Sequence, residues 1–262
     1  MEYLKTNKNF WNRYSQERGP WSRRSSKELI EKARQGEVEI FITTQKIVPQ
    51  AWLPDSWQGI KVLGLAAGGG QQMPIVAAAG AEVTSFDLSV EQLQRDQEVC
   101  EEEGLSIKTV QGDMRDLSCF SDSQFDLIIN PVSNCFIDDV TLVWKECFRV
   151  LTPGGVLISG SNNPVAYALD QAAYERGELN LVFKIPYSDL TDLPESERAS
   201  KVEREDAFEF GHSLTELIAE QIAAGFTIIG FYEDEWGERF EQPLDRILPQ
   251  FFATMGRKTD LI

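Results

Sequence analysis

The stretch "KVLGLAAGGGQQ" at residues 61–72 combines a short apolar run, three glycines and two amide side chains. A short apolar run followed by glycines is typical of a buried strand that ends in a turn. A glycine-rich turn in this place lets a ligand lie directly against the backbone. We therefore expect residues 60–66 to form a strand and the loop after it to bind a ligand.

The composition fits one large α/β domain with additions and excludes several classes of protein. The chain has 262 residues, 42% of them hydrophobic, which is enough for a substantial core. Its formal charge of −17 disfavours binding to nucleic acid. We expect no membrane span, because no apolar run approaches the ~20 residues required, and the polar start lacks a secretory signal.

Cysteine and histidine are too sparse to predict a metal centre. Four cysteines stand singly, without a CxxC pair, and the chain has one histidine. This pattern disfavours a zinc site or a disulfide framework and favours a reducing cytoplasmic location.

From residue 60 onward, strand-like and helix-like segments alternate, which indicates a parallel sheet covered on both faces. The predicted strands are residues 60–66, 82–89, 107–114, 125–132 and 156–161. Helices are predicted at 73–81, 89–104 and 139–151, where the last repeats its apolar residues at helical spacing. A further helix at 213–226 and strands at 227–235 and 249–258 complete the pattern.

The expected fold is a Rossmann-like, seven-stranded, mostly parallel sheet with an N-terminal helical cap and an insertion after the fifth strand. Residues 1–54 form the cap, in which residues 25–37 look like a short amphipathic helix. Residues 55–161 form the ligand-binding core and 211–262 its last helix and strands. The polar insertion, 162–210, has one strong strand signal, at 178–188.

Asp87 ends the second predicted strand, about 20 residues after the glycines. At that distance a carboxylate can accept hydrogen bonds from both hydroxyls of a ribose. A dinucleotide and S-adenosylmethionine (SAM) fit this arrangement equally, so a nicotinamide-dependent oxidoreductase and a SAM-dependent enzyme both remain open here.

Three further features favour SAM. The sequence "QGDM" (111–114) places an acid and a methionine at the end of the third strand, where they suit the amine and ring of adenine. The glycine loop lacks the third glycine of G-x-G-x-x-G, which serves helix packing beneath a pyrophosphate. "FDLIINPVSNCF" and "RVLTPGG" then follow in the order expected of strands four and five of a methyltransferase.

With these motifs, residues 58–160 resemble the class I SAM-dependent methyltransferases, most closely the small-molecule branch that includes quinone-biosynthesis C-methyltransferases. The E/D-x-G-x-G-x-G signature of that family falls on Gly64, Ala66, Gly68 and Gly70. Its acid, which helps hold the amino group of SAM, is therefore a glycine here. Gln71, Gln72 or Asn130 could replace it as a neutral acceptor.

The resemblance implies a set of cofactor contacts, with S-adenosylhomocysteine (SAH) as the product. These are Ala66, Ala67, Gly68, Gly70, Gln72, Asp87, Leu88, Gln92, Gly112, Asp113, Met114, Asn130, Pro131 and Val132. "NPVS" (130–133) partly resembles the motif of amino-group methyltransferases, but it lacks the second proline and the aromatic residue. We expect it to line the methionine end of SAM instead.

Catalytic residues are not evident in the sequence. Methyl transfer needs positioning more than acid–base chemistry, and the weak candidates for a base are His212, Asp138 and Asp139. Trp11, Tyr14 and Trp21 either form the packing core of the cap or close over SAM, because aromatic faces attract a sulfonium cation.

The expected function is methyl transfer to a small molecule, with the acceptor pocket built from residues 1–25, the loop after strand four and the insertion. A SAM-binding protein without catalysis is the alternative from another class. The acceptor, the methylated element and the oligomeric state cannot be inferred from the sequence.

Overall fold

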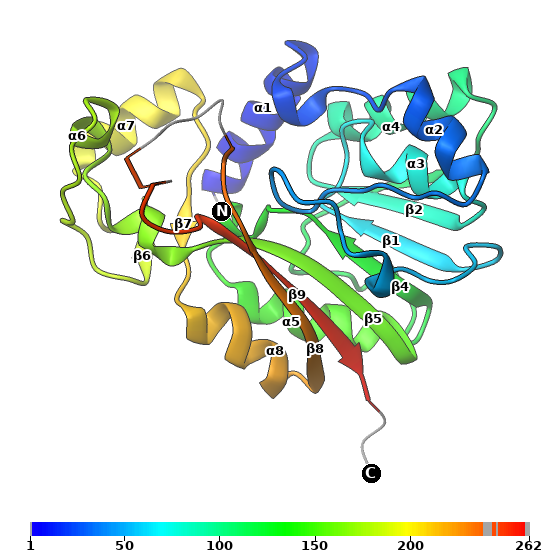
Figure 1. Cartoon of the computed structure of the whole chain (residues 1–262). Coiled ribbons are helices and arrows are strands. Elements are labelled where there is room, and N and C mark those ends of the chain that lie inside the picture. The colour runs from blue at the N-terminus through cyan, green and yellow to red at the C-terminus, as the bar shows by residue number, and fades with distance from the viewer. Residues whose placement is uncertain (1, 238–242, 245, 260–262) are drawn as a thin grey trace.

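The chain forms a seven-stranded sheet with the strand order β3-β2-β1-β4-β5-β9-β8 in the computed structural model, which describes residues 2–237, 243, 244 and 246–259 (Figure 1). The strands β1 to β5 run parallel, and β9 is antiparallel to both of its neighbours. The predicted α/β fold is confirmed. Its strands are β1 (Lys61–Leu65), β2 (Glu82–Asp87), β3 (Lys108–Gln111), β4 (Phe125–Asn130), β5 (Leu151–Asn162), β8 (Phe226–Asp234) and β9 (Phe251–Lys258).

Helices cover both faces of this sheet (Figure 1). On one face lie α2 (Lys27–Arg34), α3 (Gln72–Ala78) and α4 (Val90–Glu102), and on the other α5 (Val140–Val150) and α8 (Glu220–Ala223). The remaining helices are α1 (Glu2–Gln16), α6 (Gln171–Glu175) and α7 (Glu195–Arg204). None of the helices in the described part of the chain is long and apolar enough to cross a bilayer.

The apolar stripe predicted for residues 139–151 forms the centre of one core. Val140, Val143, Trp144, Cys147 and Val150 of α5 are all buried. The indole N–H of Trp144 donates to the carbonyl of Glu216, 2.9 Å away, so that its one polar atom is satisfied. A second core, on the opposite face of the sheet, packs α2 and residues 38–57 against α3 and β1.

The insertion after β5 differs most from its prediction. Only Tyr187–Ser188 of the expected strand 178–188 pairs as a strand (β6), with Phe210–Gly211 (β7). Leu181 forms only an isolated antiparallel bridge with Leu169, and Leu181 and Val182 are more than half exposed, so this apolar run is not stabilised as a full strand. The helix α7 has no buried residue, and it was not predicted from the polar sequence of the insertion.

The predicted helix 213–226 is a π-helical turn, Thr215–Ala219, that continues into α8. The reciprocal cap expected at its start is present. The N–H of Ser213 donates to Glu216 Oε2 (2.7 Å), and the N–H of Glu216 donates to Ser213 Oγ (3.2 Å).

The N-terminal helix α1 is fastened to distant parts of the chain by Asn7. Its amide nitrogen donates to the carbonyls of Phe136 and Phe208, each 3.0 Å away, and its oxygen accepts from the N–H of Phe208 (2.7 Å). In this way α1 joins the loop after β4 to the end of the insertion.

Close packing between β1 and α3 explains the missing acid at position 64. A Cβ on Gly64 would lie 2.2 Å from Sδ of Met73, which is completely buried on α3. The thioether of Met73 therefore occupies the space that a side chain at position 64 would need. Glycine is required here for the approach of helix to strand.

We expect Gly64→Ala to lower the free energy of unfolding by about 1–3 kcal/mol, the usual cost of overpacking a dense core. Met73→Ala frees the contested space, so the double variant should be less destabilised than the sum of the two single variants. Urea denaturation of the four proteins measures this coupling. Strictly additive losses would show that Met73 does not exclude a side chain at position 64.

Candidate active site

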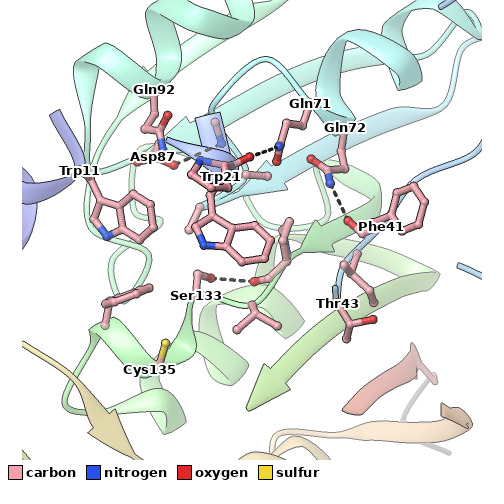
Figure 2. A pocket seen from close by; sticks show the side chains of 18 of the residues that line it. Trp11, Trp21, Phe41, Thr43, Gln71, Gln72, Asp87, Gln92, Ser133 and Cys135 are labelled. Atoms are coloured by element: carbon pink, nitrogen blue, oxygen red, sulfur yellow. Dashed lines mark hydrogen bonds between the residues drawn. The ribbon is translucent and has the colours of Figure 1, made fainter. Parts of the chain in front are cut away.

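A cavity of about 610 Å³ lies at the carboxyl ends of the parallel strands, the usual ligand-binding edge of such sheets (Figure 2). In this view Asp87 and Gln92 lie at one end, Cys135 lies at the other, and Trp21 lies between them. Most of the residues predicted to contact a cofactor line it: Ala66, Ala67, Gly68, Gln72, Asp87, Leu88, Gln92, Gly112, Asp113, Met114, Pro131 and Val132.

Two carboxylates hold the glycine-rich loop in place. The N–H of Gly68 donates to Asp87 Oδ2 (3.2 Å), and the N–H of Gly70 donates to Asp96 Oδ1 (2.7 Å). Asp96, on α4, also accepts a hydrogen bond from Ser85 Oγ (2.6 Å). Gly70 itself does not line the cavity, so its contribution is to shape the loop.

Asp96 is completely buried, whereas Asp87 is partly buried and lines the cavity. Burial raises the pKa of Asp87 to about 6, although N–H donors from Ser89 and Gly68 partly oppose this rise. Burial raises the pKa of Asp96 to about 7, against the stabilising hydrogen bonds from Ser85 and Gly70. Asp96 was not predicted from the sequence, because its role depends on how α4 packs beneath the loop.

Asp113, at the end of β3, takes part in an ion-pair network that reaches α1. The Nε of Arg115 donates to Asp113 Oδ1 (3.0 Å), and its Nη1 forms an ion pair with Asp138. The hydroxyl of Tyr3 also donates to Asp138 (2.7 Å). Asp138 therefore links α1 to the loop after β3 and does not line the cavity, contrary to its expected place as a candidate base.

Gln71 and Gln72 line the cavity and have their amide nitrogens occupied. Gln71 Nε2 donates to the carbonyl of Pro20 (3.1 Å), and Gln72 Nε2 donates to the carbonyl of Phe41 (2.7 Å; Figure 2). Because each nitrogen must face its carbonyl partner, the side-chain oxygen of each amide is left as an acceptor.

The side-chain oxygen of Asn130, in contrast, is already used within the protein. It is completely buried, donates to the carbonyl of Leu65 and to Ser133 Oγ (each 2.9 Å), and accepts from Ser159 Oγ (2.9 Å). It crosslinks the ends of β1, β4 and β5 and does not line the cavity. We therefore no longer assign it to the cofactor or to the amino group of SAM.

The other candidate bases also lie outside the cavity. His212 is buried, and its Nε2 lies 3.1 and 3.0 Å from the carbonyls of Asn134 and Ile137, so that this nitrogen carries the proton. Burial lowers the pKa of His212 and keeps it neutral. Asp139 caps α5 by accepting from the N–H of Thr141 (3.0 Å).

The aromatic residues of the predicted cap divide between two roles. Trp11 and Trp21 line the cavity, whereas Tyr14 packs against Phe10, with ring centroids 5.6 Å apart. The predicted segments 1–25 and 162–210 contribute Arg23, Asn162 and Glu209 to the wall. Sequence reasoning missed other parts of it, which converge from distant segments without a local motif: Leu29, residues 39–44, Trp236 and Phe251.

Comparison with known proteins identifies the family. Residues 63–159 match the methyltransferase domain family. The chain is 44% identical over 252 residues to the "Uncharacterized methyltransferase YbaJ" of Bacillus subtilis (strain 168), an alignment that covers 96% of this chain and 97% of that protein. The chain belongs to the class I SAM-dependent methyltransferases.

Other similarities agree with this assignment. Over 102 residues this methyltransferase is 37% identical to the sterol 24-C-methyltransferase erg6 of Aspergillus fumigatus, covering 38% of the chain and 27% of the relative. Its fold matches that of a SAM-dependent methyltransferase from Mesorhizobium loti with a TM-score of 0.62 at 20% identity, covering 79% and 94% of the two chains. Membership of this family decides against a nicotinamide-dependent oxidoreductase and against a SAM-binding protein without catalysis.

The buried carboxylate of Asp96 makes the stability of the methyltransferase depend on pH. Its pKa is about 7 in the folded chain against 3.8 as the ordinary value, so the folded state binds the extra proton between these limits. Protonation of Asp96 therefore stabilises the folded state fully below about pH 4, and this stabilisation is lost as the pH rises from about 4 to about 7. Asp96→Asn cannot ionise and should become increasingly stable relative to the wild type across that window.

Urea unfolding of both proteins at several pH values checks this expectation, with Asp55→Asn as an exposed control for the loss of one acidic group. Parallel stability curves for wild type and Asp96→Asn would contradict it.

Proposed function

We propose that this enzyme methylates a small, largely apolar molecule that enters the cavity beside SAM. The observation that carries the proposal is the division of one cavity into two chemically different parts. One part has the glycine loop and the strand-end carboxylates Asp87 and Asp113, and the other is walled mainly by aromatic and aliphatic side chains, together with Asn162 and Glu209.

The polar part fits SAM. Asp87, Asp113 and Met114 line this part. In the proposed complex Asp87 accepts hydrogen bonds from the ribose hydroxyls, and Asp113 and Met114 contact the adenine. A Cβ on Gly68 would lie 2.8 Å from Cβ of Gln92 and 3.2 Å from Asp87 Oδ2, so glycine lets the loop approach the start of α4 and Asp87 closely. The side-chain oxygens of Gln71 and Gln72 offer neutral acceptors for the amino group, in place of the acid that Met73 excludes.

The apolar part suits a ring-shaped acceptor. Trp11 lies against Phe136 with ring centroids 5.0 Å apart, and Trp21 lies 6.0 Å from Trp236. Such surfaces bind flat apolar molecules through area and ring stacking. The sequence resemblance to the branch with quinone-biosynthesis C-methyltransferases supports an acceptor of this kind.

When bound, SAM supplies an electrophilic methyl group on a sulfonium sulfur. The residues of the chain then have to orient the two reactants and exclude water, and such positioning can contribute ~7–11 kcal/mol. The walls of the cavity come from α1, residues 39–44 and the loops after β4 and β8, so segments from across the chain line it.

Incubation with methyl-labelled SAM and a bacterial extract tests the choice of a small-molecule acceptor. After ultrafiltration, we expect the label to be transferred to compounds in the small-molecule fraction. A parallel incubation with Asp87→Ala corrects for transfer by other enzymes in the extract. Enzyme-dependent label found only on protein or nucleic acid would overturn the proposal.

Gln71→Ala and Gln72→Ala should each weaken SAM binding about 3- to 10-fold, because each removes one hydrogen-bond acceptor for the amino group. Gln94→Ala, on the exposed side of α4, serves as the matched control and should leave binding unchanged. Isothermal titration calorimetry measures the three affinities. Unchanged affinity in both cavity variants would show that the amino group is held elsewhere.

A further inference from the structure

Four carboxylates line the cavity among the described residues: Glu39, Asp87, Asp113 and Glu209. Three of them have evident partners. Glu39 is paired with Lys32 (3.1 Å), Asp113 is paired with Arg115, and Asp87 accepts the backbone N–H groups of the glycine loop and of residue 89.

Glu209 has no ion-pair partner within the part of the chain that the structure describes. The nearby ammonium group of Lys201 instead lies 2.9 Å from Asp189 Oδ2. Glu209 Oε2 accepts a hydrogen bond from the hydroxyl of Tyr167 (2.9 Å). Its Oε1 has no protein donor among the described residues and is available to a molecule in the cavity.

Tyr167 and Asn162 connect Glu209 to the end of β5. Asn162 Nδ2 donates to the hydroxyl oxygen of Tyr167 (2.7 Å), and that hydroxyl donates to Glu209. Burial raises the pKa of Tyr167, so it stays protonated and donates. Asn162 also lines the cavity, and its side-chain oxygen is buried without a hydrogen-bond partner, which marks it as a second acceptor for a bound molecule.

The backbone around Glu209 is held firmly. The N–H of Glu209 donates to Asp189 Oδ2 (2.8 Å), and the N–H of Asp189 donates to the carbonyl of Glu209 (3.1 Å). Three residues further on, His212 is fastened to the loop after β4. The insertion thus presents Glu209 to the cavity from a rigid support, as a group that acts on a substrate requires.

We propose that Glu209 is the general base of the methyltransferase and that the acceptor is an apolar aromatic molecule with a hydroxyl group. This inference rests on the proposed function. The hydroxyl donates its proton to Glu209 Oε1, the oxygen electron pair forms the new C–O bond, and the C–S bond of the sulfonium breaks with its electrons remaining on sulfur. The products are a methyl ether, neutral SAH and a protonated Glu209.

A hydroxyl is the acceptor that needs such a base. The oxygen of a phenol becomes strongly nucleophilic only when its proton leaves, whereas a neutral amine already has a free electron pair. Burial also raises the pKa of Glu209, which makes it a better proton acceptor than an exposed carboxylate. The titratable groups around it are Tyr167, Cys135, Lys201 and Asp189.

Binding of 2-naphthol in the presence of saturating SAH tests the contact without turnover. Compared with 2-methoxynaphthalene, which has the same rings without a donor, 2-naphthol should bind about 10- to 100-fold more tightly, as expected for a hydrogen bond to a charged group. In Glu209→Gln the amide oxygen accepts from Tyr167 and the NH₂ group faces the hydroxyl. The preference for binding 2-naphthol over 2-methoxynaphthalene should then fall below about threefold.

Kinetics with 2-naphthol and SAM test the proton transfer. Glu209→Gln should lower kcat about 10²- to 10⁴-fold, and its rate should rise with pH as 2-naphthol itself ionises, without the plateau set by Glu209 in the wild type, while SAH affinity stays unchanged. The exposed control Glu203→Gln should behave as the wild type. Three results would overturn the inference. The first is that 2-naphthol is neither bound preferentially nor methylated, and the second is that Glu209→Gln keeps the wild-type rate and pH profile. The third is that 2-naphthylamine is methylated faster than 2-naphthol and without dependence on Glu209.

Loss of SAH binding in the wild type would instead contradict the proposed cofactor site, so the two failures can be told apart.

Discussion

The site depends on the hydrogen bonds that join the glycine loop to Asp87 and Asp96. A loop with so little side chain has many accessible conformations, and two carboxylates select one of them by accepting the N–H groups of Gly68 and Gly70. One carboxylate comes from β2 and the other from α4, so the loop is formed only when strand, helix and turn are assembled together. The cost is that the pKa values of both acidic groups are raised, by removal from water that is complete for Asp96 and partial for Asp87.

Periodicity and strand-end motifs were sufficient to predict the sheet, the stripe of α5 and most of the cofactor side of the cavity. They are local signals: an apolar run, a glycine turn, an acid at a strand end. Asp96 and Glu209 carry no such signal, because each is defined by partners far away in the chain. Asn130 was misassigned for the same reason, since its amide is used by β1 and β5 and not by the cavity.

The exchange of an acid for glycine at position 64 changes the charge of the site without changing the fold. Met73 takes the space, and the two amides that follow the glycines each keep a neutral side-chain oxygen at the cavity wall. Four carboxylates still line the cavity among the described residues, those of Glu39, Asp87, Asp113 and Glu209. Under the proposed function, Asp87 and Asp113 serve the cofactor and Glu209 serves the acceptor.

The position of β9 between β5 and β8 also bears on how the protein is made. This last strand completes the sheet, and Phe251 at its start contacts Trp236 with ring centroids 4.7 Å apart. On the ribosome, β1 and β2 emerge before Trp236 and Phe251, so the side of the cavity at the glycine loop is synthesised before this part of its wall. The wall can be completed only after β8 and β9 have been synthesised and have joined the sheet.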